Sequence, residues 1–416
     1  GFVNCIVRDC LSENNEGAGF VVSTRALKSH SKDLEIKFEN CKVVNCTNGF
    51  WIYGPYDNGP KGIIEILNSQ VINTNSAAFY FKSKSKSSAK VVVSNCELKN
   101  TAYLFESPIY FELHTRDVKH HGGVEFNDCI VHHDEYTPFL TNLERIRSDG
   151  LHDISGHVIV HSPFPILMDL GENNSMNFRL KTTLQRKEHI NVFTPLFFQV
   201  GENTANSFMK IRGKGTYLLY AEKDSMVKLT IRCHQVNNNK DNLYFVISSP
   251  MGDLLLEDMV LHEENKEVIF KAIETGVYNI SCYAKANAFS IEGEKPLGLQ
   301  LSKRAINLFS PSGDIYFWIP AGNPKIKIKV EGQRYREQVK AVLFNSKGEI
   351  IDTKDNISGH DPYYFIVDRG ENIKGEMWCL RLEKASGAML ENVFITIILP
   401  TIPSISFSPL EMYVIE

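Results

Sequence analysis

A short motif recurs five times in the first third of the chain, and this repeat constrains the fold more than any other feature. Each copy reads Asn or Asp, then Cys or Ser, any residue and an aliphatic residue, and four copies add a second Asn/Asp and Cys/Thr pair. The copies are Val3–Cys10, Glu39–Cys46, Leu67–Thr74, Ser94–Thr101 and Asn127–Asp134. Their leading residues are 36, 28, 27 and 33 positions apart. This variation indicates short strands joined by loops of unequal length, because a helical repeat would hold its period more tightly.

Apolar segments flank each copy of the motif. A mostly alternating apolar run precedes the last four copies, which is typical of strands with one buried face. A strand that is usually aromatic follows each leading Asn or Asp, at Phe20–Val22, Phe50–Tyr53, Phe79–Phe81, Leu104–Phe105 and Phe139–Leu140. Three strands per repeat predict coils of triangular section, each strand pairing in parallel with its copy about 4.8 Å along the axis. The predicted fold of residues 1–187 is therefore a right-handed parallel β-helix.

Equivalent residues stack in such a fold. We expect one inward column of small side chains and one polar column whose amides bond to the backbone at a bend. The members are Cys5, Cys41, Ser69, Cys96 and Cys129 for the first, and Asn4, Asn40, Asn68, Asn95 and Asp128 for the second. A weaker sixth coil at Asp153–Leu170 is expected to end the array, since terminal repeats are atypical. Because Gly1 already lies within a repeat, we expect further coils and a signal segment upstream.

Separate apolar-rich strands with turn signals between them replace the repeat from about Glu188. This pattern predicts two antiparallel β-sandwich domains, at residues 188–302 and 303–416. The clearest hairpin turn is Asn345–Gly348. The Pro-rich stretch at Pro400–Pro403 is excluded from a central strand by its missing amide donors. The predicted fold class is all-β throughout.

Composition excludes several classes of function. The net charge of −4 comes without any Lys/Arg block, so a nucleic-acid partner is not expected. No run of 18 apolar residues predicts a membrane span. Nine cysteines form no C-x-x-C pattern, although Cys233 and Cys282 could pair as a disulfide in a secreted protein. No phosphate loop, G-x-S-x-G elbow or H-E-x-x-H pattern is present, and we expect neither a cofactor nor a metal.

Several stretches resemble bacterial pectate-lyase-like β-helix proteins that carry C-terminal β-sandwich modules. Gly122–Phe126, Asp153–Gly156 and Met168–Gly171 are similar to their last coils, and Tyr316–Gly322 and Gly375–Leu382 to their final sandwich. The resemblance spans most of the chain and fixes architecture better than activity. It implies a secreted, periplasmic or cell-surface protein that acts on a polysaccharide as a glycoside hydrolase or lyase.

The richest polar cluster lies around the junction of the fourth and fifth coils. Its candidate catalytic residues are Arg116, Lys119, His120, His121, His133 and Asp134, which could supply a base and an anion clamp. The alternative interpretation is a solvated loop. Candidate substrate-binding residues are Trp51, Tyr53, Tyr56 and Tyr80, because aromatic faces stack on pyranose rings. Alternation predicts that Trp51 and Tyr53 face away from Phe50 and Ile52. Ordinary packing is the alternative for each of them.

Three functions fit this sequence. The first is a glycoside hydrolase or polysaccharide lyase, with part of its active site upstream of residue 1. The second is a non-catalytic glycan-binding or adhesive surface protein. The third is a phage-type tail spike, which would be an intertwined trimer. Each has a glycan as its partner, and the sequence leaves the glycan and the oligomeric state open.

Overall fold

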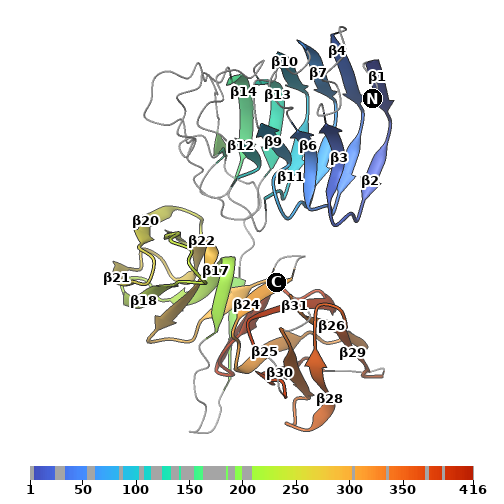
Figure 1. Ribbon diagram of the computed structural model, residues 1–416. Helices are drawn as coiled ribbons and strands as arrows, with labels where there is room; N and C mark the ends of the chain where they lie inside the picture. Colours follow the sequence, from blue (N-terminus) through green and yellow to red (C-terminus); the bar gives the residue numbers. More distant parts are fainter. Residues whose placement is uncertain are drawn as a thin grey trace. The chain divides into compact units, whose positions relative to one another are not determined.

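The chain forms two compact units, Gly1–Glu188 and His189–Glu416 (Figure 1). The computed structural model describes residues 4–23, 33–53, 61–83, 88–102, 107–113, 124–132, 140–141, 154–162, 184–185, 193–198, 209–301, 305–333, 337–370, 374–386 and 389–415. Every regular element within these ranges is a β-strand, so the predicted all-β class is confirmed. No helix in the described part of the chain is long and apolar enough to cross a membrane.

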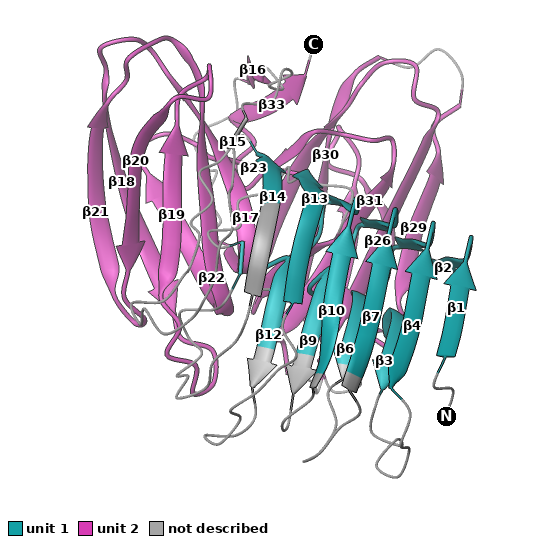
Figure 2. Cartoon of the chain, turned by 90° about the horizontal axis from the view of Figure 1, so that it is seen from above, with its two compact units in different colours: residues 1–188 teal, residues 189–416 magenta. Residues whose placement is uncertain are grey.

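The first unit is a stack of parallel coils with three strands each, which confirms the predicted β-helix (Figure 2). The first strands of the coils are β1 (Asn4–Arg8), β4 (Leu34–Glu39), β7 (Lys61–Leu67), β10 (Ser88–Ser94), β13 (Val124–His132) and β14 (Ile154–His161). The second strands are β2 (Leu11–Glu13), β5 (Lys42–Val44), β8 (Gln70–Ile72) and β11 (Glu97–Lys99), continued by the ends of β13 and β14 and by β15 (Leu184–Gln185). The third strands are β3 (Ala18–Ser23), β6 (Asn48–Tyr53), β9 (Phe79–Ser83) and β12 (Ile109–Leu113).

The core of this unit consists of side chains that point inward from all three strands of each coil. Phe50 stacks on Phe20 and Phe79 at ring-centroid distances of 5.2 and 5.7 Å, and Phe81 stacks on Phe111 at 4.9 Å. Burying one such side chain stabilises the fold by about 1.5–3 kcal/mol. The aromatic strands predicted from the sequence therefore line the interior with rings from successive coils.

The first copy of the repeat does not begin where the sequence pattern predicts. Asn4 pairs with Glu35 and Cys5 with Ile36, so neither belongs to the expected columns. Asp9 occupies the first position of the polar column instead. Its backbone amide donates to the Glu39 carbonyl, and its carboxylate accepts a hydrogen bond from the Asn40 side-chain amide at 3.1 Å. An Asn/Asp–Cys pair occurs twice within this copy, at Asn4–Cys5 and at Asp9–Cys10, and the hydrogen-bond register selects the second. With Asp9 as its start, the intervals become 31, 28, 27 and 33 residues.

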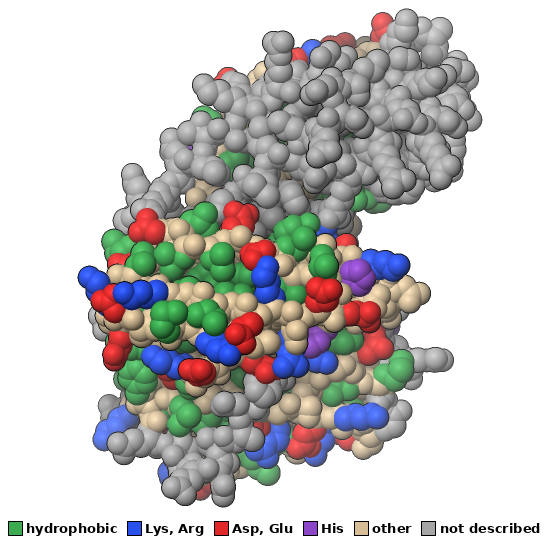
Figure 3. Space-filling view, turned by 90° about the vertical axis from the view of Figure 1, so that its left-hand side faces the viewer, with side chains coloured by type: hydrophobic (Ala, Val, Ile, Leu, Met, Phe, Trp, Pro, Cys, Tyr) green, Lys and Arg blue, Asp and Glu red, His purple; other side chains and the backbone are tan. Residues whose placement is uncertain are grey.

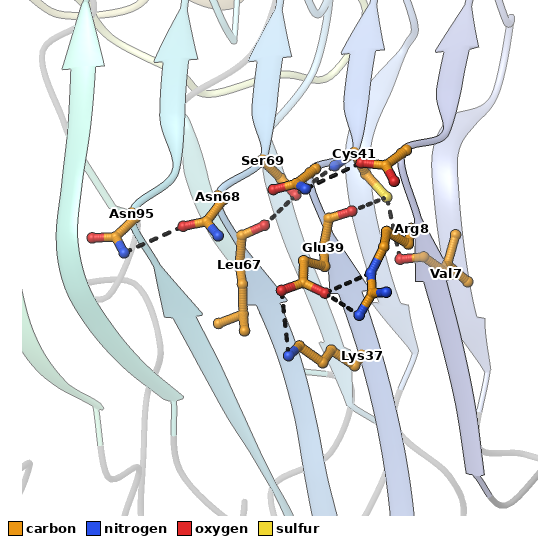
Figure 4. Close-up of polar contacts among 11 residues, drawn as sticks. Val7, Arg8, Lys37, Glu39, Cys41, Leu67, Asn68, Ser69 and Asn95 are labelled. Carbon is orange, nitrogen blue, oxygen red and sulfur yellow. Dashed lines mark hydrogen bonds and ion pairs between the residues drawn. The ribbon is translucent and has the colours of Figure 1, made fainter.

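Asparagine and aspartate residues form both bends of the coils. Between the first and second strands stand Asp9, Asn40, Asn68, Asn95 and Asp128, and between the second and third strands stand Asn14, Asn45, Asn73 and Asn100. All nine have φ between 49° and 57°. Asn and Asp tolerate this left-handed conformation better than other non-glycine residues. Side-chain amides also bond along the columns, as from Asn95 to Asn68 at 3.3 Å (Figure 4).

The predicted column of small side chains is confirmed for its later members. Cys41, Ser69 and Cys96 are all buried, and the Cys41 amide donates to the Ser69 hydroxyl at 3.1 Å. The Cys41 thiol donates to the carbonyls of Val7 and Glu39, which lie on two adjacent coils (Figure 4). A small donor at this position therefore satisfies backbone acceptors inside the bend.

The disulfide considered for the second unit is not formed. Cys233 and Cys282 are both buried free thiols, and burial raises the pKa of the Cys233 thiol to about 11. Both side chains belong to the hydrophobic core of that unit, where they pack as small apolar groups.

The second unit consists of antiparallel strands. Those before residue 302 are β16 (Phe193–Phe197), β17 (Lys210–Ala221), β18 (Met226–His234), β19 (Leu243–Ser248), β20 (Leu254–Val260), β21 (Asn265–Lys271), β22 (Gly276–Gly293) and β23 (Gly298–Gln300). Those after it are β24 (Ile306–Phe309), β25 (Gly313–Ile319), β26 (Lys325–Gly332), β27 (Val339–Phe344), β28 (Ile350–Ile357), β29 (Tyr363–Asp368), β30 (Glu376–Lys384), β31 (Asn392–Leu399), β32 (Ser404–Ser406) and β33 (Glu411–Ile415). The Asn345–Gly348 turn joins β27 to β28, as predicted.

Strands from both sets of this unit share one large sheet and one large hydrophobic cluster, while β16 and β33 pair as a separate two-stranded sheet. Strand β24 pairs with β17 on one side and β31 on the other, and β23 pairs with β32. One hydrophobic cluster extends from Met209 to Phe407. The division of this unit into residues 188–302 and 303–416 stays a prediction.

Charges on the outer faces of the second unit are paired rather than gathered by sign. Lys228 of β18 contacts Glu267 of β21 at 2.8 Å, and Arg232 contacts Glu292 of β22 at 3.2 Å. Acidic, basic and hydrophobic side chains are interspersed on the face in Figure 3. Exposed ion pairs of this kind contribute little stability. Because the opposite charges are paired, this face has no strong positive or negative electrostatic potential.

The asparagine columns can be tested with Asn45, whose amide donates to Asn14 and whose carbonyl accepts from Asn73, both at 3.1 Å. We expect Asn45→Ala to lose these bonds and to strain the bend, at a combined cost of about 2–3 kcal/mol. Hydrogen exchange of the β5 and β6 amides would measure it. The control is Asn237→Ala, because Asn237 is exposed at φ 55° in the second unit, outside the columns. Equal costs for both variants would show that the columns add nothing to the bend.

Candidate functional site

The candidate catalytic residues lie outside the described part of the chain. Arg116, Lys119, His120 and His121 fall within residues 114–123, and His133 and Asp134 fall within residues 133–139. Their catalytic role stays a prediction. Tyr56 also lies outside the described residues, and Tyr53 is described only as a backbone position at the end of β6.

Two of the four predicted aromatic residues lie on adjacent coils in register. Trp51 of β6 pairs with Tyr80 of β9, and Tyr80 pairs with Tyr110 of β12. Phe50 and Ile52 are buried, while Trp51 is only partly buried, so the predicted alternation along β6 is confirmed for these three residues. The same alternation turns Tyr80 and Tyr110 outward, because the strand neighbours of each are buried in the core.

These three residues, Trp51, Tyr80 and Tyr110, form a continuous aromatic column on the outer face of the third strands. Ring centroids are 5.6 Å apart between Trp51 and Tyr80, with an interplanar angle of 64°. Between Tyr80 and Tyr110 the distance is 5.2 Å and the angle 35°. Edge and tilted contacts of this kind are favourable, by about 0.5–1.5 kcal/mol for each pair. The column therefore holds its own rings in place across three coils.

Tyr110 is the member of this column that the sequence analysis missed. The third strand of the fourth coil was expected at Leu104–Phe105, but the structure forms β12 at Ile109–Leu113. The signal was present, since Ile109-Tyr110-Phe111 has the same inward-outward-inward pattern as Phe79-Tyr80-Phe81. The strand begins later than expected because the loop before it is longer than in the preceding coils.

Three carboxyl groups on the outer faces of the coils have pKa values below the ordinary range. Hydrogen bonds from Arg8 lower the pKa of Glu39, and a hydrogen bond from Lys90 lowers that of Glu125. Burial opposes the shift at Glu97, but Lys99, His132 and Gln70 together lower its pKa. Glu39 is shown with Arg8 and Lys37 in Figure 4. All three are ionised at neutral pH and so cannot donate a proton to a leaving group.

A polar cluster occupies the outer face of the second strands in the later coils. It contains Gln70 of β8, Glu97 and Lys99 of β11, His132 of β13 and His161 of β14; we name it the Glu97 cluster. The Glu97 carboxylate accepts from Gln70 at 2.9 Å and contacts Lys99 at 2.8 Å and His132 Nε2 at 3.1 Å. The His132 and His161 rings stack at 4.9 Å with an interplanar angle of 11°.

Opposing effects act on the His132 imidazole. Burial lowers its pKa most strongly, the Glu97 charge raises it, and His161 and Lys99 lower it further. The net pKa is below 6.5, so the ring is neutral at physiological pH. Within the described residues, no group of three or more His, Cys, Asp or Glu side chains is arranged to hold a metal ion.

Comparison with known proteins finds no matching family model and no matching curated protein. Among solved structures, one match is to the M60 catalytic domain with the CBM51-1 and CBM51-2 domains from Clostridium perfringens ZmpB, at 8% identity and a TM-score of 0.19. It covers 55% of this chain and 40% of that one, which is less than half of that chain's length.

Two further structures match at similar levels. The CBM22-1-CBM22-2 tandem domain from Paenibacillus barcinonensis Xyn10C matches at 6% identity and a TM-score of 0.16, over 54% of this chain and 91% of that one. The enzymatically active domain of bacteriophage CBA120 tailspike protein 4 matches at 8% identity and a TM-score of 0.13, over 98% of this chain and 44% of that one. TM-scores this low carry no argument about function.

The charges around His132 predict how its titration responds to substitution. Its NMR titration midpoint should lie below 6.5 and fall further in Glu97→Gln, because the carboxylate that favours the imidazolium is lost. His161→Ala should raise the midpoint, since a neighbouring positive charge and some burial are removed. His234, whose pKa burial lowers to about 4, is the internal control and should not respond. A rise in Glu97→Gln would contradict the observed contact.

Proposed function

We propose that this protein binds a polysaccharide across successive coils of its β-helix. The observation that carries the proposal is the aromatic column of Trp51, Tyr80 and Tyr110, which presents one outward ring per coil on three adjacent coils. Aromatic faces pack against the apolar faces of sugar rings, and a regular row of them suits a polymer better than a single small molecule.

The spacing of the column supports a chain-like ligand. Parallel pairing fixes the distance between coils at about 4.8 Å, and the ring contacts of 5.6 and 5.2 Å follow that spacing. Rings held by their neighbours lose little conformational freedom on binding, which improves affinity. A glycan lying along the coil axis would meet one aromatic side chain at each of these three coils.

Catalysis on the bound chain, as a glycoside hydrolase or polysaccharide lyase, is the further part of this proposal. It depends on Arg116, Lys119, His120, His121, His133 and Asp134, which lie outside the described residues. Such an activity implies a secreted, periplasmic or cell-surface location, where polysaccharides are encountered.

Non-catalytic glycan binding is the second candidate function. One observation favours it: Glu39, Glu97 and Glu125 all have lowered pKa values, whereas a glycosidase needs one carboxyl group that stays protonated. Reducing-end release from the bound polysaccharide would separate hydrolysis from binding, and unsaturated products would indicate a lyase. A stable trimer in solution would instead favour the tail-spike alternative.

Substitution of the central ring tests the aromatic column. On the polysaccharide that binds best in a glycan panel, Tyr80→Ala should weaken binding about 5- to 30-fold, as expected for loss of 1–2 kcal/mol at a central contact. Tyr80→Phe should bind like the unaltered protein, because the ring is kept. Affinity electrophoresis in gels containing the polysaccharide would measure both.

The matched control is Ile72→Ala. Ile72 is partly buried on the outer face of β8, in the same coil as Tyr80 but on another sheet. The Ile72→Ala variant should lose a similar apolar contact without weakening polysaccharide binding. The proposal fails if Tyr80→Ala and Ile72→Ala reduce affinity equally, or if the folded protein retains no polysaccharide in the panel.

A further inference from the structure

The Glu97 cluster interrupts a face that is otherwise partly aliphatic. Lys99, His132 and His161 follow one another in register on β11, β13 and β14. The equivalent positions on the two preceding coils are Val44 and Ile72; Val44 pairs with Ile72, and Ile72 pairs with Lys99. The structure therefore places one lysine and two imidazoles in a row on three adjacent coils, and among the described residues the Glu97 carboxylate contacts Lys99 and His132.

The charge of this row depends on pH. At neutral pH the Lys99 ammonium and the Glu97 carboxylate balance, and the His132 ring is neutral. As pH falls, His132 gains charge beside Lys99, with the His161 ring stacked on it at 4.9 Å, and Glu97 is its carboxylate partner among the described residues. Like charges this close repel each other, so protonation leaves an uncompensated positive site.

We propose that Lys99, His132 and His161 form an acid-dependent binding site for an oxyanion, a sulfate or carboxylate group. An oxyanion would offset the positive charge that His132 gains beside Lys99 and would accept hydrogen bonds from Lys99 and from the imidazole rings. Glu97 is the internal competitor for the same donors. The site lies on the second strands of the coils, whereas the aromatic column lies on the third strands, so the proposal does not depend on the polysaccharide function.

Binding and protonation must be linked. A ligand that prefers the protonated form of His132 raises the pKa of that ring, and a tenfold preference for the protonated form over the neutral form raises the pKa by about one. The groups facing His132 in the described residues are Glu97 and Lys99 of β11 and His161 of β14. An anion bound there should therefore raise the pKa of His132.

NMR titration of the histidine rings in the full chain tests this proposal. With sodium sulfate in place of sodium chloride at equal ionic strength, the titration midpoint of His132 should move upward by about 0.5–1 in pH, a roughly 3- to 10-fold preference for the protonated form. His234, which contacts the Ser290 hydroxyl at 2.8 Å in the second unit, should not move. Equal changes at both histidines, or a His132 midpoint that rises with neither sulfate nor galacturonate, would overturn the proposal.

The source of the anion is distinguished in the same titration. Galacturonate and neutral galactose replace sulfate in two further arms. A higher midpoint with both sulfate and galacturonate supports a general oxyanion site, and a higher midpoint with galacturonate alone supports a site for acidic sugars. A change with galactose would overturn the proposal, because it would not depend on charge.

Two substitutions separate ligand binding from structure. Glu97→Gln removes the competing carboxylate, so sulfate should bind at least about threefold more tightly at pH 6 even though the midpoint of His132 without sulfate falls. Lys99→Met should abolish most of the rise in midpoint that sulfate induces. Lys42→Met is its matched control, because Lys42 is exposed on the same face at β5. Weaker sulfate binding in Glu97→Gln, or equal losses in the two methionine variants, would contradict the site.

Discussion

Parallel pairing between coils is the constraint on which the first unit depends. Each strand bonds only to its copies on neighbouring coils, so a side chain on one coil must fit the side chain above and below it. In the core, phenylalanine rings therefore stack on phenylalanine rings. At the bends, cysteine lies beside serine and side-chain amides bond to side-chain amides. The same constraint acts outside, where it produces both the aromatic column and the row of Lys99, His132 and His161.

The bends show how a non-glycine residue can turn a coil at low cost. Asn and Asp adopt positive φ with little strain, and their side chains bond along the column at the same time. Glycine would give the conformation without the side-chain bonds. Cysteine or serine then follows and donates into the bend, as Cys41 and Ser69 do. The paired motif is therefore explained by backbone conformation and hydrogen bonding together.

The two faces proposed for binding differ in physical character. The aromatic column offers a stacking surface that carries no charge, while the Glu97 cluster gains net positive charge as His132 protonates. Glu39, Glu125 and Glu97 are held ionised by Arg8, Lys90 and Lys99 respectively, and act as partners of cations rather than as acids. Recognition along the coils is therefore better supported by the described residues than proton transfer is.

The sequence by itself determined the parallel coils, the inward aromatic strands and the outward direction of Trp51, because these depend on local alternation and on a repeated motif. It pointed to Asn4 as the first bend, since Asn4 begins the full motif and Asp9 only repeats its Asn/Asp–Cys pair, and pairing with β4 selects Asp9 instead. Tyr110 and the Glu97 cluster also required the tertiary structure. Their members come from different coils joined by loops of unequal length, and only the register between strands brings them together.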